Sequence, residues 1–175
     1  MKLSFFRSIG FSLIELMVVL AIAGILMLVA FPSFKDMIHG QRLKTQANDT
    51  LAAIVYAKSV ALKTRSEVTI CALKTNVDNQ CGTSGTEWAN GWLVFIDDNG
   101  DGVVSENEGV LKSRGDYKKV TSKSSVAGFI FDGEGVANTS GDIHFCYSEA
   151  NGNKRRRLTL TPAGNPLITS LPDCI

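Results

Sequence analysis

The chain has 175 residues, enough for one domain with a substantial core, and its 18 basic and 17 acidic residues leave a formal net charge of +1. This balance points to no particular partner and argues against a protein that binds polyanions through its bulk charge. The 4 cysteines form no C-x-x-C pair and have no histidine at metal-ligand spacing, which favours disulfides in an oxidising compartment over zinc.

The first element expected is a membrane helix. Residues 16–31 carry no charge, and the run from Phe11 to Phe31 would be about 31 Å long as a helix, enough to cross a bilayer. The preceding leader, "MKLSFFRSIG", carries Lys2 and Arg7, which predict an N-in, C-out orientation by the positive-inside rule. An ordinary secretory signal has its small-residue cleavage site after the apolar core, but here Gly10 lies before it.

The segment "G-F-S-L-I-E-L" after this basic leader resembles the prepilin peptidase signal of type IV pilins and type II secretion pseudopilins. The resemblance implies cleavage after Gly10, N-methylation of the new N-terminal Phe11, and retention of the apolar segment as the packing spine of a filament. It also implies the partners, which are the prepilin peptidase, an inner-membrane assembly platform, and other minor and major pilins. The implied location is the inner membrane, with one membrane pass and the head in the periplasm, and then a filament at the cell surface.

Glu15 is the charged residue inside this apolar segment. An unpaired carboxylate in hydrocarbon costs several kcal/mol, so such a residue usually has a cationic partner and a function. Cleavage after Gly10 creates a cation, the amine of Phe11, one helical turn away. The resemblance implies an intermolecular pair, in which Glu15 of an incoming subunit meets the Phe11 amine of its neighbour. The alternative is a glutamate tolerated near the membrane interface.

The helix is expected to continue beyond the membrane to about Arg65, with Pro32 kinking it rather than ending it. Residues 12–65 would then form a rod roughly 80 Å long. Its second part, residues 32–65, is predicted to be amphipathic, with an apolar stripe on a globular domain and a solvated charged face. The stripe comprises Phe34, Ile38, Leu51, Ile54, Val55 and Leu62, and the charged residues are Lys35, Asp36, Arg42, Lys44, Asp49, Lys58 and Lys63.

From Glu67 onward the sequence consists of short β-rich runs broken by glycine and aspartate: "EVTICALK", "GWLVFID", "GVLKS", "VAGFIF", "IHFCY", "RRRLTLT" and "PLITSL". Runs at this spacing predict an antiparallel sandwich. The "VTIC…C" opening, the stretch "WANGWLVFIDDNGDG" and a late cysteine pair resemble the head domain of the GspH/FimT family. The predicted fold class is therefore α+β and pilin-like, with a leader (1–10), a membrane and filament-core helix (11–31), an amphipathic helix (32–65) and a β-rich head (66–175).

The cysteine pairing follows from this resemblance. Cys71 and Cys81 bracket the loop "ALKTNVDNQ" and are expected to pair. Cys146 and Cys174 are expected to tie the last strand to the sheet, as the C-terminal pair of the family does. Each bridge is typically worth about 2–4 kcal/mol, which suits an exposed filament subunit.

Residues 97–108, "DDNGDGVVSENE", match the EF-hand calcium-loop pattern at every ligand position. Oxygen ligands at this spacing surround one calcium ion within a single loop. The alternative is a polar Asn-Gly and Asp-Gly hairpin connection that needs no metal, because a strand rather than a helix precedes the loop. No other cofactor is expected. The predicted ligands are Asp97, Asn99, Asp101, the Val103 carbonyl, Ser105 and Glu108.

The run "NKRRRLTLTPAGNP" is basic. The DNA-binding members of the family carry arginines after a C-terminal glycine, and these arginines contact phosphate. The matching stretch here, Gly164 to Leu167, has no arginine, which argues against DNA capture. Two interpretations of the basic run remain: a compensating DNA contact, or a charged strand edge that prevents aggregation. Its residues are Lys154, Arg155, Arg156 and Arg157.

The sequence contains no P-loop, nucleophile elbow or H-E-x-x-H motif, and the two histidines, His39 and His144, are expected to be packing or surface residues. A non-enzyme is therefore predicted. The resemblance favours a minor pilin of the FimT/FimU type that helps to initiate type IV pilus assembly at or near the filament tip. A GspH-like minor pseudopilin of type II secretion and a DNA-binding pilin of natural transformation remain alternatives.

Overall fold

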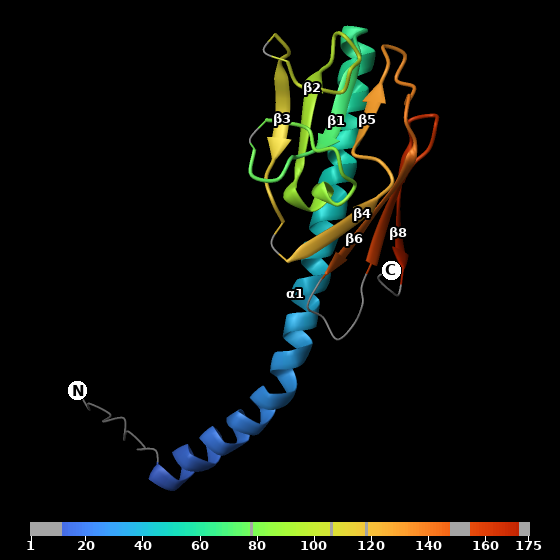
Figure 1. The fold of residues 1–175 in the computed structure, drawn as a ribbon. Helices are drawn as coiled ribbons and strands as arrows, with labels where there is room; N and C mark the ends of the chain where they lie inside the picture. Colours follow the sequence, from blue (N-terminus) through green and yellow to red (C-terminus); the bar gives the residue numbers. More distant parts are fainter. Residues whose placement is uncertain (1–11, 78, 106, 118, 148–154, 172–175) are drawn as a thin grey trace, which may run out of the picture. The chain divides into compact units, whose positions relative to one another are not determined.

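The computed structural model describes residues 12–77, 79–105, 107–117, 119–147 and 155–171, without the side chains of residues 29, 32, 33, 35 and 36. The chain divides into two compact units between Ile38 and His39, and each is described by itself. The described elements are one long α-helix, one short 3-10 helix and eight strands (Figure 1).

The long helix α1 (Leu13–Thr64) continues through Pro32, as predicted, and its end near Arg65 is also confirmed. Arg65 has a φ of 54°, in the left-handed region that ends many helices, and its N–H still donates to the Ala61 carbonyl at 2.8 Å. Among the residues that the structure describes, no helix is long and apolar enough to cross a membrane. The span that begins at Phe11 stays a prediction from the sequence.

In the first compact unit, the described large apolar side chains of α1 are exposed, including Leu13, Met17, Leu20 and Leu28. An open apolar pocket of about 580 Å³ lies along the end of this unit, lined by Met27, Ala30, Phe31, Phe34 and Ile38. A monomeric soluble protein rarely exposes so large an apolar surface, so this segment requires an apolar partner or medium.

In the second compact unit, α1 buries a face made mostly of small side chains. Its members are adjacent in sequence or three or four residues apart, which is the spacing of one helix face. The predicted stripe was largely wrong: Ile54 is fully buried and Leu51 packs against the core, but Val55 and Leu62 are about half exposed and Phe34 and Ile38 lie outside this unit. The buried face is Leu43, Gln46, Ala47, Thr50, Ala53, Ile54, Ala57 and Ala61.

Two of the charged residues on α1 make contacts within the head instead of pointing only to solvent. Lys58 Nζ donates to the carbonyls of Ala163 (3.0 Å) and Gly164 (3.1 Å), so the helix holds the turn after the strand of residues 155–160. Asp49 pairs with Arg114 at 3.4 Å. For these two residues the prediction of a purely solvated charged face is corrected, whereas Arg42, Lys44 and Lys63 are exposed as predicted.

The head contains two four-stranded antiparallel sheets. The first has the order β3 (Val110–Arg114), β2 (Trp92–Ile96), β1 (Val68–Ala72) and β5 (Gly128–Phe131). The second has the order β4 (Val120–Ser124), β6 (Gly141–Tyr147), β7 (Arg155–Leu160) and β8 (Pro166–Leu171). The predicted α+β class with a long N-terminal helix and antiparallel sheets is therefore confirmed.

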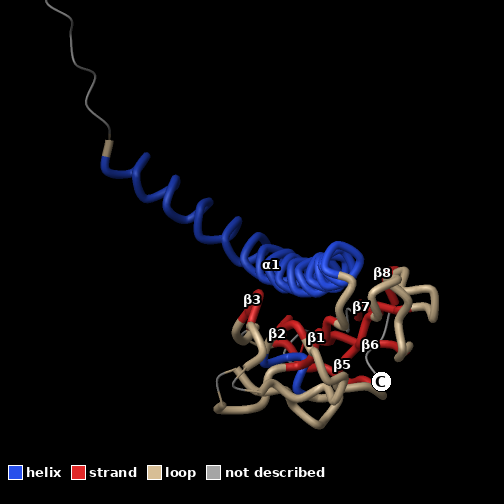
Figure 2. The backbone as a smooth tube through the Cα atoms, turned by 90° about the horizontal axis from the view of Figure 1, so that it is seen from above, coloured by secondary structure: helices blue, strands red, loops and turns tan. Residues whose placement is uncertain are grey.

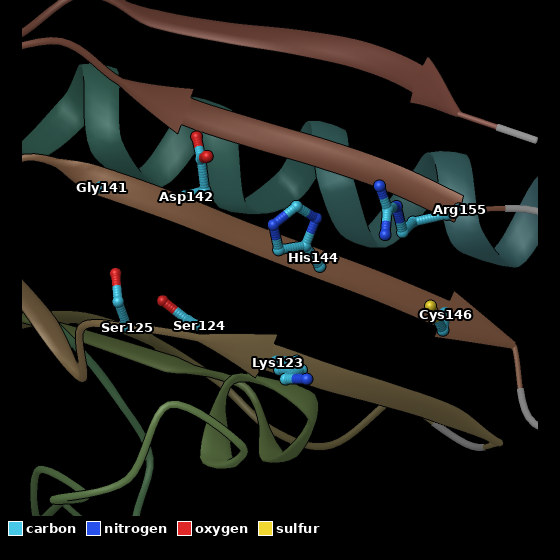
Figure 3. A pocket seen from close by; sticks show the side chains of 8 residues that line it. All are labelled: Lys123, Ser124, Ser125, Gly141, Asp142, His144, Cys146 and Arg155. Carbon is cyan, nitrogen blue, oxygen red and sulfur yellow. The ribbon is translucent and has the colours of Figure 1, made fainter. Parts of the chain in front are cut away.

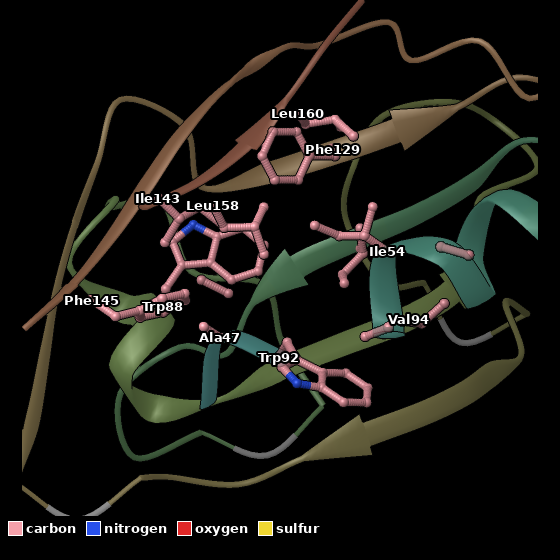
Figure 4. Close-up of a cluster of buried hydrophobic side chains, with 14 of the residues drawn as sticks. Ala47, Ile54, Trp88, Trp92, Val94, Phe129, Ile143, Phe145, Leu158 and Leu160 are labelled. Atoms are coloured by element: carbon pink, nitrogen blue, oxygen red, sulfur yellow. The ribbon is translucent and has the colours of Figure 1, made fainter. Parts of the chain in front are cut away.

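One core joins the helix and both sheets (Figure 4), and Figure 2 shows α1 running along the strands. Ala47 and Ile54 of α1 lie among Trp88, Phe129 and Leu158, which come from the 3-10 helix η1 (Glu87–Asn90), the first sheet and the second sheet. Full burial of a large apolar side chain contributes about 1.5–3 kcal/mol, so this cluster dominates the stability of the head. The small residues of α1 allow the helix backbone to approach the strands closely.

Strand β4 and the helix η1 were not predicted. The β4 sequence, "VTSKS", is too polar to signal a strand by composition, yet Val120 and Ser122 alternate as buried residues. The Ser122 hydroxyl donates to the Thr86 carbonyl (2.6 Å) and accepts from the Ala89 N–H (2.9 Å), so its burial next to η1 leaves no polar atom unpaired.

Candidate functional site

Glu15 lies in the first turn of α1 and is exposed. A carboxylate at this end of a helix is stabilised by the helix dipole. No ion pair of Glu15 occurs within the described residues. Gly10 and Phe11 lie outside the described residues, so the processing site and the pairing of Glu15 with the Phe11 amine stay predictions.

The second sheet presents a polar face on the side opposite the core. Side chains alternate along each strand, so Leu158 and Leu160 of β7 point to the core while Arg155 and Arg157 point away from it. The strand register pairs Arg155 with Cys146, Arg157 with His144, and His144 with Lys123 of β4. We call the residues Lys123, His144, Arg155 and Arg157 the basic face.

A pocket of about 450 Å³ opens on the basic face (Figure 3). His144 lies between Asp142 and Arg155 in this view, and Lys123 comes from the neighbouring strand β4. Asp142 is already engaged, because the Thr159 hydroxyl donates to its Oδ1 at 2.5 Å. The lining residues are Lys123, Ser124, Ser125, Gly141, Asp142, His144, Cys146 and Arg155.

Arg155 is the most unusual residue of the pocket. Its side chain is only 6% exposed, yet its Nε and Nη1 atoms have no hydrogen-bond partner. Burial lowers the pKa of His144, and the charges of Arg155, Arg157 and Lys123 lower it further, against an opposing effect of Asp142. The site is therefore cationic through its arginines and lysine, with a neutral imidazole at neutral pH.

The basic run of the sequence does not form a single surface. Strand β7 lies between β6 and β8, so the interpretation of Arg155 and Arg157 as a charged strand edge is wrong. Arg156 points to the other side of the sheet from its two neighbours, and its guanidinium donates to the Ser170 hydroxyl. Lys154 lies outside the described residues.

The loop of residues 97–108 is held by its own backbone. Asp97 is fully buried, and it accepts hydrogen bonds from the Asp101 N–H (3.1 Å), the Gly102 N–H (3.0 Å) and the Thr69 hydroxyl (2.6 Å). Gly102 has a φ of 70°, which a residue with a side chain rarely adopts.

The other predicted ligands of this loop are turn-forming residues in the structure. Asp101 accepts the Val103 N–H at 2.7 Å, Asn99 accepts the Asp101 N–H at 3.1 Å, and Glu108 accepts the Ser105 N–H at 2.8 Å. No group of three or more histidine, cysteine or acidic side chains in the described part of the chain is arranged to hold a metal ion. The calcium site stays a prediction, and the hydrogen bonds show how the loop keeps its shape without one.

The predicted bridge between Cys71 and Cys81 is confirmed, with an S–S distance of 2.03 Å and a Cα separation of 5.5 Å. It fastens the loop of residues 73–80 to β1. Cys146 is also disulfide-bonded. Because Cys174 lies outside the described residues, the pairing of Cys146 with Cys174 stays a prediction.

The two histidines lie in different surroundings. His39 of α1 stacks on Tyr147 of β6, with ring centroids 4.0 Å apart, so it is a packing residue as expected. His144 is a surface residue of β6, also as expected, but its place in the pocket was not foreseen. The alternation of buried and outward residues in "IHFCY" indicates that the His144 side chain points away from the core. The pocket itself gave no signal in the sequence, because Lys123 and one wall of the pocket come from β4, a strand that was not predicted.

Comparison with known families agrees with this architecture. A family model described as "Type II transport protein GspH" matches residues 46–164, which include the end of α1 and the head as far as the turn before β8. The chain belongs to the GspH family. A second model, described as the prokaryotic N-terminal methylation motif, matches residues 6–31 and covers the leader signal and the apolar segment.

Two solved structures share the fold of this GspH-family chain, and both are crystal forms of the type IV minor pilin FimU of Pseudomonas aeruginosa. One is 21% identical with a TM-score of 0.57, and the match covers 77% of this chain and 96% of FimU. The other is 22% identical with a TM-score of 0.54, covering 76% and 100%. No curated protein matches the sequence. The GspH match and the methylation motif make the chain a pilin-like protein of the GspH family, and the two FimU structures show that it shares their fold.

Proposed function

We propose that this protein is a minor pilin that helps to initiate assembly of type IV pili and is located at or near the filament tip. One observation carries the proposal: a single chain contains a methylation motif, an exposed apolar helix and a GspH-type head. The likeness of the fold to FimU, a type IV minor pilin, supports a pilus over other filaments.

In this proposal the N-terminal segment works in three successive environments. The prepilin peptidase cleaves after Gly10 in the inner membrane, and the new amine of Phe11 is methylated. The apolar side chains from Leu13 to Phe31 are first covered by lipid and then by the same segments of neighbouring subunits. The head stays in the periplasm until the subunit enters the filament.

Glu15 has a defined role in this sequence of events. Its carboxylate lies in the first helical turn, where it is exposed and has no ion pair among the described residues. Inside a filament the same carboxylate would be in apolar surroundings, and it would be strongly destabilising unless a cation paired with it. The amine of Phe11 on a neighbouring subunit is that cation, so only subunits in the correct register satisfy both charges.

The test is the yield of pili sheared from a deletion strain that is complemented with wild type, Glu15→Ala or Glu134→Ala. Glu134 is an exposed carboxylate of the head and serves as the matched control. We expect wild type and Glu134→Ala to restore the pili, and Glu15→Ala to leave the strain without them. Normal piliation of the deletion strain would reject the role in initiation.

A minor pseudopilin of a type II secretion system is the alternative that a specific observation favours, because the matching family model is described as a type II transport protein. The two functions share the leader, the helix and the head. Export of folded enzymes by the deletion strain distinguishes them: lost export with normal pili would assign the protein to secretion. A catalytic role is not part of either proposal.

A further inference from the structure

The inference begins with the buried guanidinium of Arg155. Burying a charge costs free energy unless hydrogen bonds and an opposite charge compensate for it. Arg155 is 6% exposed, its buried Nε and Nη1 atoms lack hydrogen-bond partners, and its side chain lines an open pocket of about 450 Å³. A pocket lined by a guanidinium with two unpaired nitrogens favours an anion.

The neighbouring side chains make the pocket selective for a negative group. Lys123, on β4, and Arg157, on β7, act on His144 with the same positive sign as Arg155. The acid of the pocket, Asp142, accepts a hydrogen bond from Thr159 and does not pair with Arg155 within the described residues. The hydroxyl groups of Ser124 and Ser125 border the opposite side of the pocket (Figure 3).

We propose that this pocket binds the carboxylate of an aspartate or glutamate side chain on a neighbouring subunit, with Arg155 as the principal contact and Lys123 and His144 beside it. That the occupant belongs to a subunit rests on the proposed function in a filament. The pocket itself is independent of that function, because its geometry lies within one head.

The structure favours a single carboxylate over a nucleic acid for three reasons. A volume of about 450 Å³ accommodates one side chain, not a duplex. Asp142 lines the pocket and repels a row of phosphates more strongly than the single negative charge of one carboxylate. Arg156 points to the opposite side of the sheet and binds Ser170, so the basic run offers no continuous track for a phosphate backbone.

The test uses the full chain in detergent micelles with isotope-labelled histidine. The chain has 2 histidines, so the NMR signals of His144 report on the pocket and those of His39 serve as an internal control. The probe is N-acetylglutamate amide, which carries one carboxylate, and N-acetylglutamine amide is the uncharged control of the same size. The variants are Arg155→Met, Arg155→Lys and Arg156→Met.

We expect the glutamate probe to shift the His144 signals saturably and to raise the pKa of His144, while the glutamine probe has no effect and His39 does not respond. Because a hydrogen bond to a charged group is lost, Arg155→Met should weaken binding at least about tenfold. Arg155→Lys should retain part of the affinity, and Arg156→Met should bind like wild type.

The absence of saturable shifts, or equal binding by wild type and Arg155→Met, would overturn the proposal. Tighter, Arg155-dependent binding of a single-stranded oligonucleotide would also overturn it and identify nucleic acid as the ligand. Inorganic phosphate that competes as well as the glutamate probe would show a general anion site instead. Thermal unfolding of Arg155→Met should show no loss of stability, because this change removes a buried charge with two unpaired guanidinium nitrogens.

The occupant is tested in the pilus assay. Arg155→Met should lower the yield of pili and Arg156→Met should not. Binding of the probe together with an unchanged yield would reject the neighbouring subunit as the occupant while keeping the pocket. A deletion strain with normal pili would reject the proposed function, and the NMR result would still decide the pocket.

Discussion

The two sheets of the head have the same number of strands and the same antiparallel pairing, but their outer faces differ. The outer face of the first sheet is covered: Cys71, Leu93 and Phe95 form a second small apolar cluster with Cys81 and Val104 from the adjoining loops. The outer face of the second sheet carries Lys123, His144, Arg155 and Arg157. Loops that cover a face with apolar side chains add stability to it, whereas the described residues place no such apolar cluster on the outer face of the second sheet.

The largest effect is expected when the covered face loses its central side chain. Phe95→Ala should lower the free energy of unfolding by about 3–5 kcal/mol, because Phe95 is fully buried under the loops. The measurement is urea unfolding of the full chain in detergent. The matched control is Thr121→Ala on the outer face of the second sheet, which should cost less than about 1 kcal/mol. Equal losses in the two variants would mean that the two faces do not differ in this way.

The second largest effect concerns the Cys71–Cys81 disulfide, which fastens a loop over the outer face of the first sheet. The double variant Cys71→Ala and Cys81→Ala should lose about 2–3 kcal/mol, because the bridge closes a loop with a sequence separation of 10 residues. The same urea titration measures it. A double variant as stable as wild type would show that the apolar contacts hold the loop without the bridge.

The loop of residues 97–108 contributes Val104 to the same cover, and its predicted calcium site can be tested directly. If calcium binds, an excess of ten times the dissociation constant should stabilise the head by about 1.4 kcal/mol over a chelator. Asp101→Ala should remove this difference. Asp98→Ala, an exposed neighbour outside the predicted ligand set, should keep it. Identical melting curves of wild type with calcium and with chelator would end the calcium hypothesis.

The smallest effect is the pH dependence of the stability that His144 contributes on the outer face of the second sheet. Burial lowers the pKa of His144, and the positive charges of Arg155, Arg157 and Lys123 lower it further, while Asp142 opposes them. His144 therefore binds a proton more readily in the unfolded chain than in the folded one. Stability should therefore be full above the ordinary histidine pKa of about 6.5 and decrease as the pH falls through the lower folded value. His144→Gln should flatten this slope in thermal unfolding between pH 7 and pH 5. An unchanged slope would exclude His144 as its source.

The helix shows how far the sequence could be used. Its bounds followed from the apolar run and from the periodicity up to Arg65, because hydrogen bonding within a helix is local. Its buried face did not follow, because the prediction gave weight to large residues such as Val55 and Leu62. Half of the residues on the face that packs are alanine, since a helix that lies close to two sheets needs small side chains, and alanine gives little hydropathy signal.

The candidate sites also fall into two groups, those that the sequence predicted and the pocket that it did not. Motifs that lie within a short stretch were found: the leader signal, the Cys71–Cys81 loop and the turn-forming acids of residues 97–108. The pocket was not found, because its members come from β4, β6 and β7 and meet only through the strand register. Among them, Lys123 lies on a strand whose polar composition gave no signal.

The sequence by itself determined the leader motif, the long helix, the β-rich head and one disulfide, because each depends on residues that are near one another along the chain. Tertiary structure alone decided which faces are covered. Alternation in β7 separates Arg155 from Leu158 in any sheet, but only the position of β7 between β6 and β8 makes it an interior strand. The burial of the unpaired Nε and Nη1 atoms of Arg155 likewise depends on neighbours that are distant in sequence, since desolvation is a property of the packed fold.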